Sequence, residues 1–356
     1  MRAHNGHGTG MADPGATYIL PLKRTSSRGL GDLPQYLGRV AEWAEVLVVD
    51  GSEPEVFAAH SRELPTGVAH LAPVHRCLNG KVAGVLTGLE RARTELCVIA
   101  DDDVRYTETV FRRVLDLLAD ADVVRPQNYF LPLPWHARWD TARSLLNRAL
   151  GADYPGTLGV RRSVLLRAGG YCGDVLFENL EMIRTVRAAG GRDVWEPSVF
   201  VARQPCSVRH FWSQRVRQAY DDFAQPFRLA GELALLPLVV FGTRRFHLLP
   251  AIAAAAGAGL AEAGRRRNRG TEVFPASSAL WAPLWLLERS LAVWAALWLR
   301  LAGGVPYAGV RIRQAGHSQR ELRRMLRDGL LAPAARPVPQ AHSARIRFRR
   351  GSVRVP

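Results

Sequence analysis

The sequence predicts an α/β protein with a mostly parallel sheet, followed by a membrane-associated helical region. Short apolar segments alternate with helical patterns over residues 16–225, which is typical of parallel strands joined by helices. Two of these apolar segments end in acidic residues, at Asp50 and at Asp101–Asp103. From about residue 226 the chain consists of long apolar stretches separated by basic residues, which indicates a second, membrane-associated part.

Local patterns predict the elements of the first part in alternation. A continuous apolar run is typical of a buried parallel strand, and apolar residues spaced at three to four are typical of a helix. We predict strands at Ala16–Leu22, Glu45–Asp50, Leu96–Ala100, Asp122–Arg125 and Leu158–Val160, and helices at Leu33–Ala44, 78–93, Val110–Leu118, Ser163–Ala168 and 178–188. Ligands bind at the carboxyl ends of strands in open α/β sheets, so the acids that follow two strands mark the predicted site.

Three apolar stretches make up the predicted membrane-associated part, Leu229–Phe241, Phe246–Ala263 and Ala279–Leu299. None is an uninterrupted span of about 20 apolar residues, since the third carries Glu288-Arg289. Three crossings would place the basic C-terminal tail outside the cytoplasm, against the positive-inside tendency. We therefore predict a membrane hairpin of the first two stretches followed by an interfacial helix. Three buried helices of a soluble domain are the alternative.

The formal net charge of +16 indicates a polyanionic partner, such as nucleic acid, anionic lipid or a phosphorylated substrate. The excess of basic residues lies at Arg265–Arg269 and after Arg311, beside the apolar stretches, whereas residues 16–225 hold most of the acids. Charge in that place favours a membrane surface, and nucleic-acid binding would rest on charge alone. We predict a membrane partner and no nucleic-acid partner.

The chain divides into four parts in this prediction. Residues 1–15 lack the apolar core of a signal peptide, so we expect them to be disordered and the catalytic domain to face the cytoplasm. Residues 16–225 form the catalytic domain, 226–310 the membrane-associated helices and 311–356 a basic tail that is mobile from Arg320 onward. The four cysteines lack metal-binding or disulfide spacing and are expected to be reduced thiols.

The run Asp101-Asp102-Asp103 is the strongest sign of chemistry. Three acids on one turn repel each other unless a cation joins them, and carboxylates with substrate phosphates are the usual ligands of Mg²⁺ or Mn²⁺. We predict a metal at this turn. The alternative is a solvated acidic turn that caps a helix beginning near Thr107.

Further candidate residues lie on other predicted elements. Asp50 and Lys81 are placed to contact a nucleoside or phosphate, although each is also common as an ordinary turn or helix residue. Glu178 and Glu181 share a face at a helix start, where a carboxylate can act as general base or simply complement the helix dipole.

The segment 210–218 mixes aromatic and cationic residues. His210 or Arg217 is a candidate to neutralise a leaving diphosphate, and Trp212 a candidate to stack on a sugar. The alternative is an amphipathic helix on a membrane surface. The polar and aromatic region Trp135–Tyr154 is a plausible acceptor-side loop.

An ordered set of motifs resembles the family-2 glycosyltransferases with the GT-A fold, and among them most the ceramide-glucosyltransferase-like branch. The resemblance covers residues 16–225, and the apolar region after them is similar too. The motifs are the strand with Pro21, VVDGS ending at Ser52, NGK at 79–81, IADDD at 99–103, GTLGVRR at 156–162, FENLEM at 177–182 and Gln214-x-x-Arg217.

The resemblance implies a role for each matched residue. It implies that Asp50 holds the nucleoside, that Asp101 and Asp103 bind the sugar phosphate and the metal, and that Gln214 and Arg217 lie near the diphosphate and acceptor. With the candidates named above, the predicted nucleotide-sugar site consists of Pro21, Asp50, Lys81, Asp101 and Asp102, and the predicted diphosphate and acceptor side of His210, Trp212, Gln214 and Arg217. Two positions depart from the family pattern. Asn179 replaces the Asp expected to be the base, so that role passes to Glu178, then Glu181, or is lost. Gln218 replaces the Trp of the QxxRW motif.

The sequence therefore predicts a metal-dependent, inverting glycosyltransferase that moves a sugar from a nucleotide-diphosphate donor to a lipid or lipid-linked acceptor. Two other functions stay open. A nucleotidyltransferase would need a Gly-rich basic loop after the first strand, which Lys23–Gly31 matches in part. A non-catalytic, membrane-bound nucleotide-sugar-binding homologue would explain Asn179.

Overall fold

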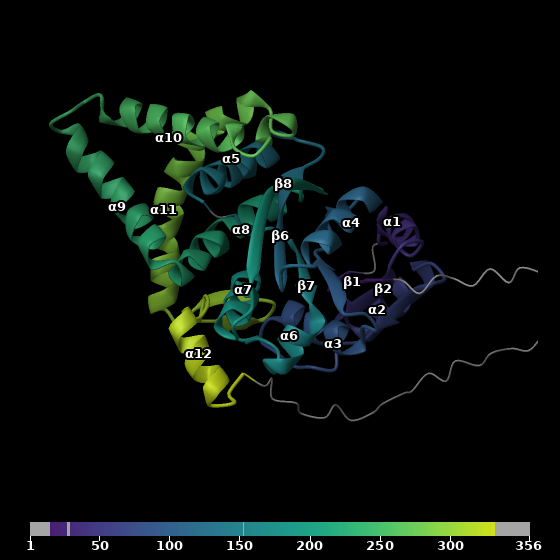
Figure 1. Cartoon of the computed structure of the whole chain (residues 1–356). Helices are drawn as coiled ribbons and strands as arrows, with labels where there is room; N and C mark the ends of the chain where they lie inside the picture. Colours follow the sequence, from purple (N-terminus) through teal and green to yellow (C-terminus); the bar gives the residue numbers. More distant parts are fainter. Residues whose placement is uncertain (1–14, 27–28, 152, 332–356) are drawn as a thin grey trace, which may run out of the picture.

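The computed structural model describes residues 15–26, 29–151 and 153–331, so the predictions for residues 1–14 and for the tail beyond 331 lie outside the described residues (Figure 1). The α/β class is confirmed by an eight-stranded sheet in the order β3-β2-β1-β4-β7-β6-β8-β5. Four of its seven strand pairings are parallel and three are antiparallel, so the sheet is mixed. The antiparallel pairings all involve β7 or β5.

The strands are short and mostly apolar, as predicted. Their bounds are β1 (Thr17–Leu22), β2 (Glu45–Asp50), β3 (Val68–Leu71), β4 (Leu96–Ala100), β5 (Val104–Arg105), β6 (Val123–Phe130), β7 (Thr157–Arg161), β8 (Asp193–Arg203), β9 (Val305–Tyr307) and β10 (Val310–Ile312). The prediction missed β3, β5, β8 and the separate two-stranded sheet of β9 and β10.

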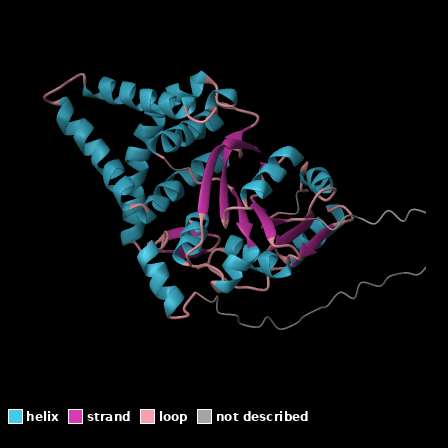
Figure 2. Ribbon diagram, in the orientation of Figure 1, coloured by secondary structure: helices cyan, strands magenta, loops and turns pink. Residues whose placement is uncertain are grey.

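Helices cover both faces of the sheet (Figures 1 and 2). Their bounds are α1 (Leu33–Val40), α2 (Pro54–Glu63), α3 (Gly80–Arg91), α4 (Glu108–Leu117), α5 (Trp135–Leu150), α6 (Arg162–Arg167), α7 (Glu178–Ala188), α8 (Val208–Tyr220), α9 (Pro226–Thr243), α10 (Leu249–Arg266), α11 (Ala282–Leu301) and α12 (Gln319–Arg327). The region predicted as an acceptor-side loop is largely the helix α5.

Alternate residues of β1 belong to two separate cores, because neighbouring side chains of a strand point to opposite faces. Tyr18 and Leu20 pack with α1 and α4, whereas Ile19 packs with α3, α6 and α7. Both cores consist of fully buried apolar side chains, which fixes the strand ends in space.

Two glycines let α3 approach β1 closely. A Cβ at Gly84 would lie 2.9 Å from the Cβ of Pro21, and a Cβ at Gly88 would overlap Ile19. The close packing sets the N-terminus of α3 beside the carboxyl end of β1. Lys81 in the first turn of α3 therefore reaches the predicted site.

Helices α8 to α11 form a second body that packs on α5, on one side of the sheet (Figure 1). Among the described helices, only α9 is long and apolar enough to cross a membrane, and none of its residues is buried. The C-terminal half of α10 packs on α5, where a Cβ at Gly264 would overlap the backbone of Leu145. The predicted membrane crossing by α10 is not supported, because the C-terminal half of this helix packs on α5.

The start of the predicted mobile tail is folded, which corrects that prediction. Residues 319–327 form α12, which begins with a capping box of Ser318 and Glu321 and packs against α7. The tail residues after Arg311 continue from the β9–β10 hairpin, and residues 175 and 314 form a β-bridge. The C-terminal segment therefore lies against the helix that carries Glu178 and Glu181.

Candidate functional site

The three aspartates occupy a tight turn at the carboxyl end of β4. The Asp101 amide donates to the Gly156 carbonyl at 2.9 Å, and the Val104 amide donates back to the Asp101 carbonyl at 3.1 Å. A Cβ at residue 156 would lie 2.6 Å from Oδ2 of Asp101, so glycine lets the start of β7 pass beside the carboxylate.

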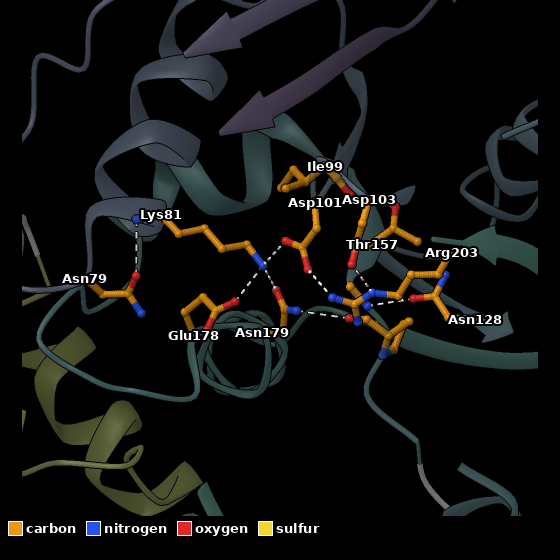
Figure 3. Close-up of polar contacts among 12 residues, drawn as sticks. Asn79, Lys81, Ile99, Asp101, Asp103, Asn128, Thr157, Glu178, Asn179 and Arg203 are labelled. Carbon is orange, nitrogen blue, oxygen red and sulfur yellow. Dashed lines mark hydrogen bonds and ion pairs between the residues drawn. The ribbon is translucent and has the colours of Figure 1, made fainter. Parts of the chain in front are cut away.

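Lys81 joins this turn to α7. Its Nζ lies 2.6 Å from Oδ1 of Asp101, 2.6 Å from Oε1 of Glu178 and 3.4 Å from Oδ1 of Asn179 (Figure 3). The two neighbouring carboxylates raise the pKa of Lys81, overcoming the opposite effect of its burial. The predicted Asp101, Lys81 and Glu178 thus meet in one cluster.

Asn79 sets the geometry of that cluster. Its side chain accepts from the Lys81 amide at 3.1 Å and caps α3, and its Nδ2 donates to the Val175 carbonyl at 3.1 Å. The cap thereby attaches the start of α3 to the segment that leads into Glu178, which explains how residues about a hundred positions apart converge.

Arg203, at the end of β8, closes the other side of the acidic turn. Its Nε lies 2.7 Å from Oδ2 of Asp103 and its Nη2 lies 3.3 Å from Oδ2 of Asp101 (Figure 3). Burial raises the pKa of Asp103, and Arg203 only partly offsets that effect. Burial acts on Asp101 in the same direction, but Lys81 and Arg203 outweigh it and lower its pKa.

The prediction missed Arg203, although a sequence signal for it exists. Val199 and Val201 are buried in β8, and the apolar run that contains them ends at Arg203 just as other runs end at Asp50 and Asp101. The prediction considered acids at strand ends and left out cations.

Asp50 lies at the end of β2, but its carboxylate faces the interior. Oδ2 contacts Nδ1 of His60 at 2.6 Å and Nε2 of His70 at 3.2 Å, and Oδ1 accepts from the Ser52 amide at 2.9 Å. The side chain is 0% exposed. Burial opposes ionisation, but hydrogen bonds from His70, Ser52 and His60 lower the pKa of Asp50 well below its usual value. The geometry does not support direct contact with a nucleoside.

Glu181 also lies outside the cluster, which corrects its place as the second candidate base. Its side chain is 0% exposed, its Oε1 contacts Nδ1 of His317 at 2.6 Å and its Oε2 accepts from the His317 amide at 2.8 Å. Glu181 therefore holds the C-terminal segment on α7. Burial leaves it no path to an acceptor.

The four residues predicted on α8 have different surroundings. Nε2 of Gln214 lies 2.8 Å from Nε2 of His210, and Trp212 is 51% exposed beside Trp135. Arg217 lies over the Tyr307 ring, 5.3 Å from its centroid, and helps to lower the pKa of Asp101. Arg217 is thus the one of the four whose charge acts on Asp101.

Two cavities lie on the two sides of Asp102, whose Oδ2 is 2.5 Å from Nη2 of Arg24. One of about 420 Å³ has Pro21, Lys81 and Asp102 in its walls, three of the predicted nucleotide-sugar residues. The other, of about 660 Å³, is lined by Asp102, Asp103 and His210 among others. The predicted residues therefore surround space large enough for a nucleotide sugar.

Tyr307 of the β9–β10 hairpin completes the first cavity. Its hydroxyl donates to Oδ1 of Asn79 at 3.2 Å, and the neighbouring Ala308 and Val310 line the same cavity. No local pattern indicates this wall, because it comes from a hairpin more than 200 residues away from Asn79.

The acidic turn fits a divalent metal in its donor chemistry. Oδ1 of Asp103 is buried and has no hydrogen-bond partner among the described residues. A buried carboxylate oxygen without a partner is unfavourable, and a hard cation coordinated by this oxygen would supply the partner. Asp103 with Asp101 would hold the ion.

Comparisons with known proteins give structural similarities only. No family model matches the chain, and no curated protein matches it. The mannosyltransferase PcManGT from Pyrobaculum calidifontis, solved with GDP-Man and Mn²⁺, is 19% identical with a TM-score of 0.49, covering 80% of this chain and 87% of that chain. Mannosyl-3-phosphoglycerate synthase from Rubrobacter xylanophilus is 15% identical with a TM-score of 0.37, covering 61% and 75%. The bifunctional IspDF from Campylobacter jejuni is 10% identical with a TM-score of 0.34, covering 51% and 49%. All three TM-scores lie below 0.5, so we infer the function from the site alone.

Proposed function

We propose that this chain is a glycosyltransferase of the GT-A type, which moves a sugar from a nucleotide-diphosphate donor to a lipid or lipid-linked acceptor on the cytoplasmic side of a membrane. One observation carries the proposal. Asp101 and Asp103, at a strand end, lie between Lys81 and Arg203 beside a cavity of about 420 Å³.

The cavity has the mixed walls that a nucleotide sugar needs. Pro21, Leu78 and Tyr307 offer apolar and aromatic surface for a nucleoside, and Lys81 offers a cation for a phosphate. Asp102 lies at the boundary with the second cavity, where the sugar and the acceptor would meet.

The proposed reaction is a single in-line displacement that inverts the anomeric carbon. The acceptor hydroxyl loses its proton to a carboxylate, its oxygen bonds to the anomeric carbon, and the bond to the diphosphate breaks. Lys81, Arg203 and Arg217 place positive charge near the departing nucleoside diphosphate, where charge develops. A bound Mg²⁺ or Mn²⁺ would supply further charge neutralisation there.

A lipid acceptor is supported by an apolar groove in the second body. The groove measures about 440 Å³ and is lined almost wholly by apolar side chains of α9, α10 and α11, including Leu235, Ala254 and Leu287. Ser290 is one of the residues that line the groove. The neighbouring Arg289 lines a separate polar cavity, and the walls of that cavity also include Phe177, the residue before Glu178. An acyl or isoprenoid chain would fit the apolar walls of this groove.

The test uses the full chain in detergent with a panel of nucleotide sugars, Mn²⁺ or Mg²⁺, and membrane lipid extract. We expect metal-dependent release of nucleoside diphosphate that Asp103→Ala and Asp101→Asn each lower by at least about 100-fold, since each removes a carboxylate that would hold the metal ion. Asp120→Asn, at an exposed site on the same domain, is the matched control and should keep the rate.

Other products separate the alternatives. Release of pyrophosphate would identify a nucleotidyltransferase. Calorimetric binding of a donor without turnover on any lipid would identify a binding protein, and either result would overturn the proposal.

A further inference from the structure

A small polar cavity lies next to the acidic cluster and takes no part in the donor site. It measures about 50 Å³, space for on the order of three or four waters. Tyr154, Phe177, Gln218 and Asp221 are among the residues that line it. Phe177 directly precedes Glu178, so this polar cavity lies within one residue of the cluster.

Three residues that line the polar cavity carry buried polar atoms without partners in the described part of the chain. Oε1 of Gln218 is buried and accepts no hydrogen bond, and Nε of Arg143 and Nε of Arg289 are buried and donate none, among the described residues. The Asp221 carboxylate forms no hydrogen bond or ion pair with any residue that the structure describes. The neighbouring Asp222, in contrast, pairs with Arg289 at 3.1 Å. Unsatisfied donors and acceptors together suit hydroxyl groups, which serve as both.

The charges around the polar cavity argue against an anionic ligand. Its walls hold three arginines and three aspartates, so their formal charges cancel. These residues are Arg143, Arg228, Arg289, Asp153, Asp221 and Asp222. A phosphate would meet as many carboxylates as guanidinium groups, whereas a neutral hydroxyl group would meet no such opposition.

Glu178 is poorly placed to accept a proton, because Nζ of Lys81 holds its carboxylate at 2.6 Å. Asp221 belongs to the short helix Asp221–Ala224 that follows α8, and Glu178 and Arg217 both act on its carboxylate. Among the described carboxylates that line the polar cavity, Asp153 accepts from two amide side chains and Asp222 pairs with two arginines, which leaves Asp221 as the one without a partner.

We propose that the polar cavity binds the hydroxyl group of the acceptor and that Asp221 is the base that removes its proton. The inference rests on the proposed glycosyl transfer. The hydroxyl proton passes to an Asp221 oxygen, the acceptor oxygen bonds to the anomeric carbon of the nucleotide-sugar donor, and the electron pair of the broken bond leaves with the nucleoside diphosphate. Glu178 then serves to position Lys81.

The electrostatics of Asp221 agree with this role. Burial raises its pKa to about 8, with Asp222 and Glu178 acting in the same direction and Arg217 opposing them. A base with a pKa near the working pH is efficient. The charged groups that face it are Glu178 of α7, Arg217 of α8, Asp222, Arg289 of α11, Arg228 of α9, and Arg143 with Asp153 from the α5 side.

The experiment measures transfer by the full chain in detergent against pH, with the best donor and lipid extract. In the wild type kcat/KM should rise about tenfold per pH unit up to about 8 and then level, because the base must be ionised. Asp221→Asn should lower the rate by about 10² to 10⁴ and remove this pH dependence, while calorimetric donor affinity stays within about twofold. Asp221→Glu should restore part of the rate and the pH dependence.

The controls separate the possible failures. Asn is uncharged and of nearly equal size, so Asp221→Asn should fold, and donor binding checks that it has. Transfer by Asp221→Asn at the wild-type rate and pH dependence, or loss of the pH dependence only in Glu178→Gln, would overturn the role of Asp221 and leave the glycosyltransferase intact. Absence of donor binding and turnover in the wild type would remove both proposals.

Discussion

Asp50 and Asp101 end strands on either side of β1, and their carboxylates have opposite surroundings. Asp101 is 22% exposed and is held by Lys81 and Arg203 at the edge of a cavity, whereas Asp50 is enclosed by His60 and His70. The sequence pattern is the same at both strand ends. The difference lies in the neighbouring elements: His60 and His70 fill the space beyond the end of β2, whereas a cavity remains beyond the end of β4.

Asp50→Asn tests the structural role of Asp50. We expect the free energy of unfolding to fall by about 3 kcal/mol, because the change removes the buried anion to which His60, His70 and Ser52 are hydrogen-bonded. The folded-state pKa of Asp50 lies below its unfolded value of 3.8, so its stabilisation is present above about pH 4 and is lost as the pH falls through the folded-state pKa. Wild type and variant should therefore differ above pH 4 and converge in stronger acid.

Denaturant unfolding of the detergent-solubilised chain measures the difference, with donor affinity measured in parallel. Asp120→Asn, exposed and without partners among the described residues, should match the wild type. Wild-type stability with a large loss of donor affinity would instead place Asp50 in the donor site, as the resemblance implies.

Much of the cluster was predictable from the sequence at the residue scale. Asp101, Lys81 and Glu178 were predicted from separate motifs, and the structure brings them together. Arg203 and Asp221 were not: Arg203 ends an apolar run, but only acids were considered at strand ends, and Asp221 is an ordinary charged residue whose importance comes from a neighbour far along the chain. Sequence patterns report local geometry, and a single unpaired carboxylate has no local signature.

The helix α7 shows where periodicity misleads. Glu178 and Glu181 are three positions apart, a spacing that predicts one shared face. Glu178 is the first helical residue and reaches past the helix end to Lys81, whereas Glu181 lies one turn further in, under the segment that carries His317. The packing of the C-terminal segment on α7, which sequence alone did not predict, separates the two carboxylates.

His317→Ala tests this attachment at the scale of the element. The change leaves Glu181 buried without its cation, and we expect a loss of about 3 kcal/mol in unfolding free energy. Amide hydrogen exchange should speed up across α12 and the β9–β10 hairpin, because both belong to the segment that Glu181 holds. The control Ser318→Ala removes only the helix cap, with an expected loss of about 1 kcal/mol. Equal exchange rates in wild type and His317→Ala would contradict the attachment.

At the scale of the whole molecule, apolar side chains gather where α9 meets α10. Phe241, Phe246 and Leu248 are 62%, 67% and 59% exposed, and Arg244 and Arg245 lie between them in the chain. Apolar side chains beside cations are typical of surfaces that enter an anionic bilayer. The predicted membrane association remains a proposal, and this corner is the surface on which we base it.

We expect the full chain, freed of detergent, to bind vesicles that contain anionic lipid, and to bind less as salt rises, because part of the attraction is electrostatic and the net charge is +16. The double variant Phe241→Asp, Phe246→Asp should reduce vesicle binding at least tenfold and leave donor affinity unchanged. Leu150→Asp, 74% exposed on α5, is the matched apolar control and should bind like the wild type. Flotation with the vesicles measures the bound fraction. Equal flotation of wild type and double variant would exclude this corner as the membrane contact.

The α/β class and the positions of β1, β2, β4, β6 and β7 followed from apolar runs, which report burial directly. The mixed pairing did not, because strand direction depends on how β7 enters the sheet, between β4 and β6. The folded C-terminal segment was missed since its composition is basic throughout and its burial comes from contact with α7.

The attachment of Arg203 to the acidic turn has a consequence for biosynthesis. Asp103 and Arg203 are 100 residues apart, and the Tyr307 hydroxyl reaches Asn79 across 228 residues. A growing chain makes Arg24 and Lys81 before the three aspartates, but it makes Arg203, the partner of Asp103, long after them, and contacts between distant residues form slowly. During synthesis Asp103 therefore lacks its partner until Arg203 has been made, and the Tyr307 wall of the cavity forms later still. The site is among the last parts of the molecule to assemble, so a chain cut short before residue 203 carries the acidic motif without Arg203 to close its turn.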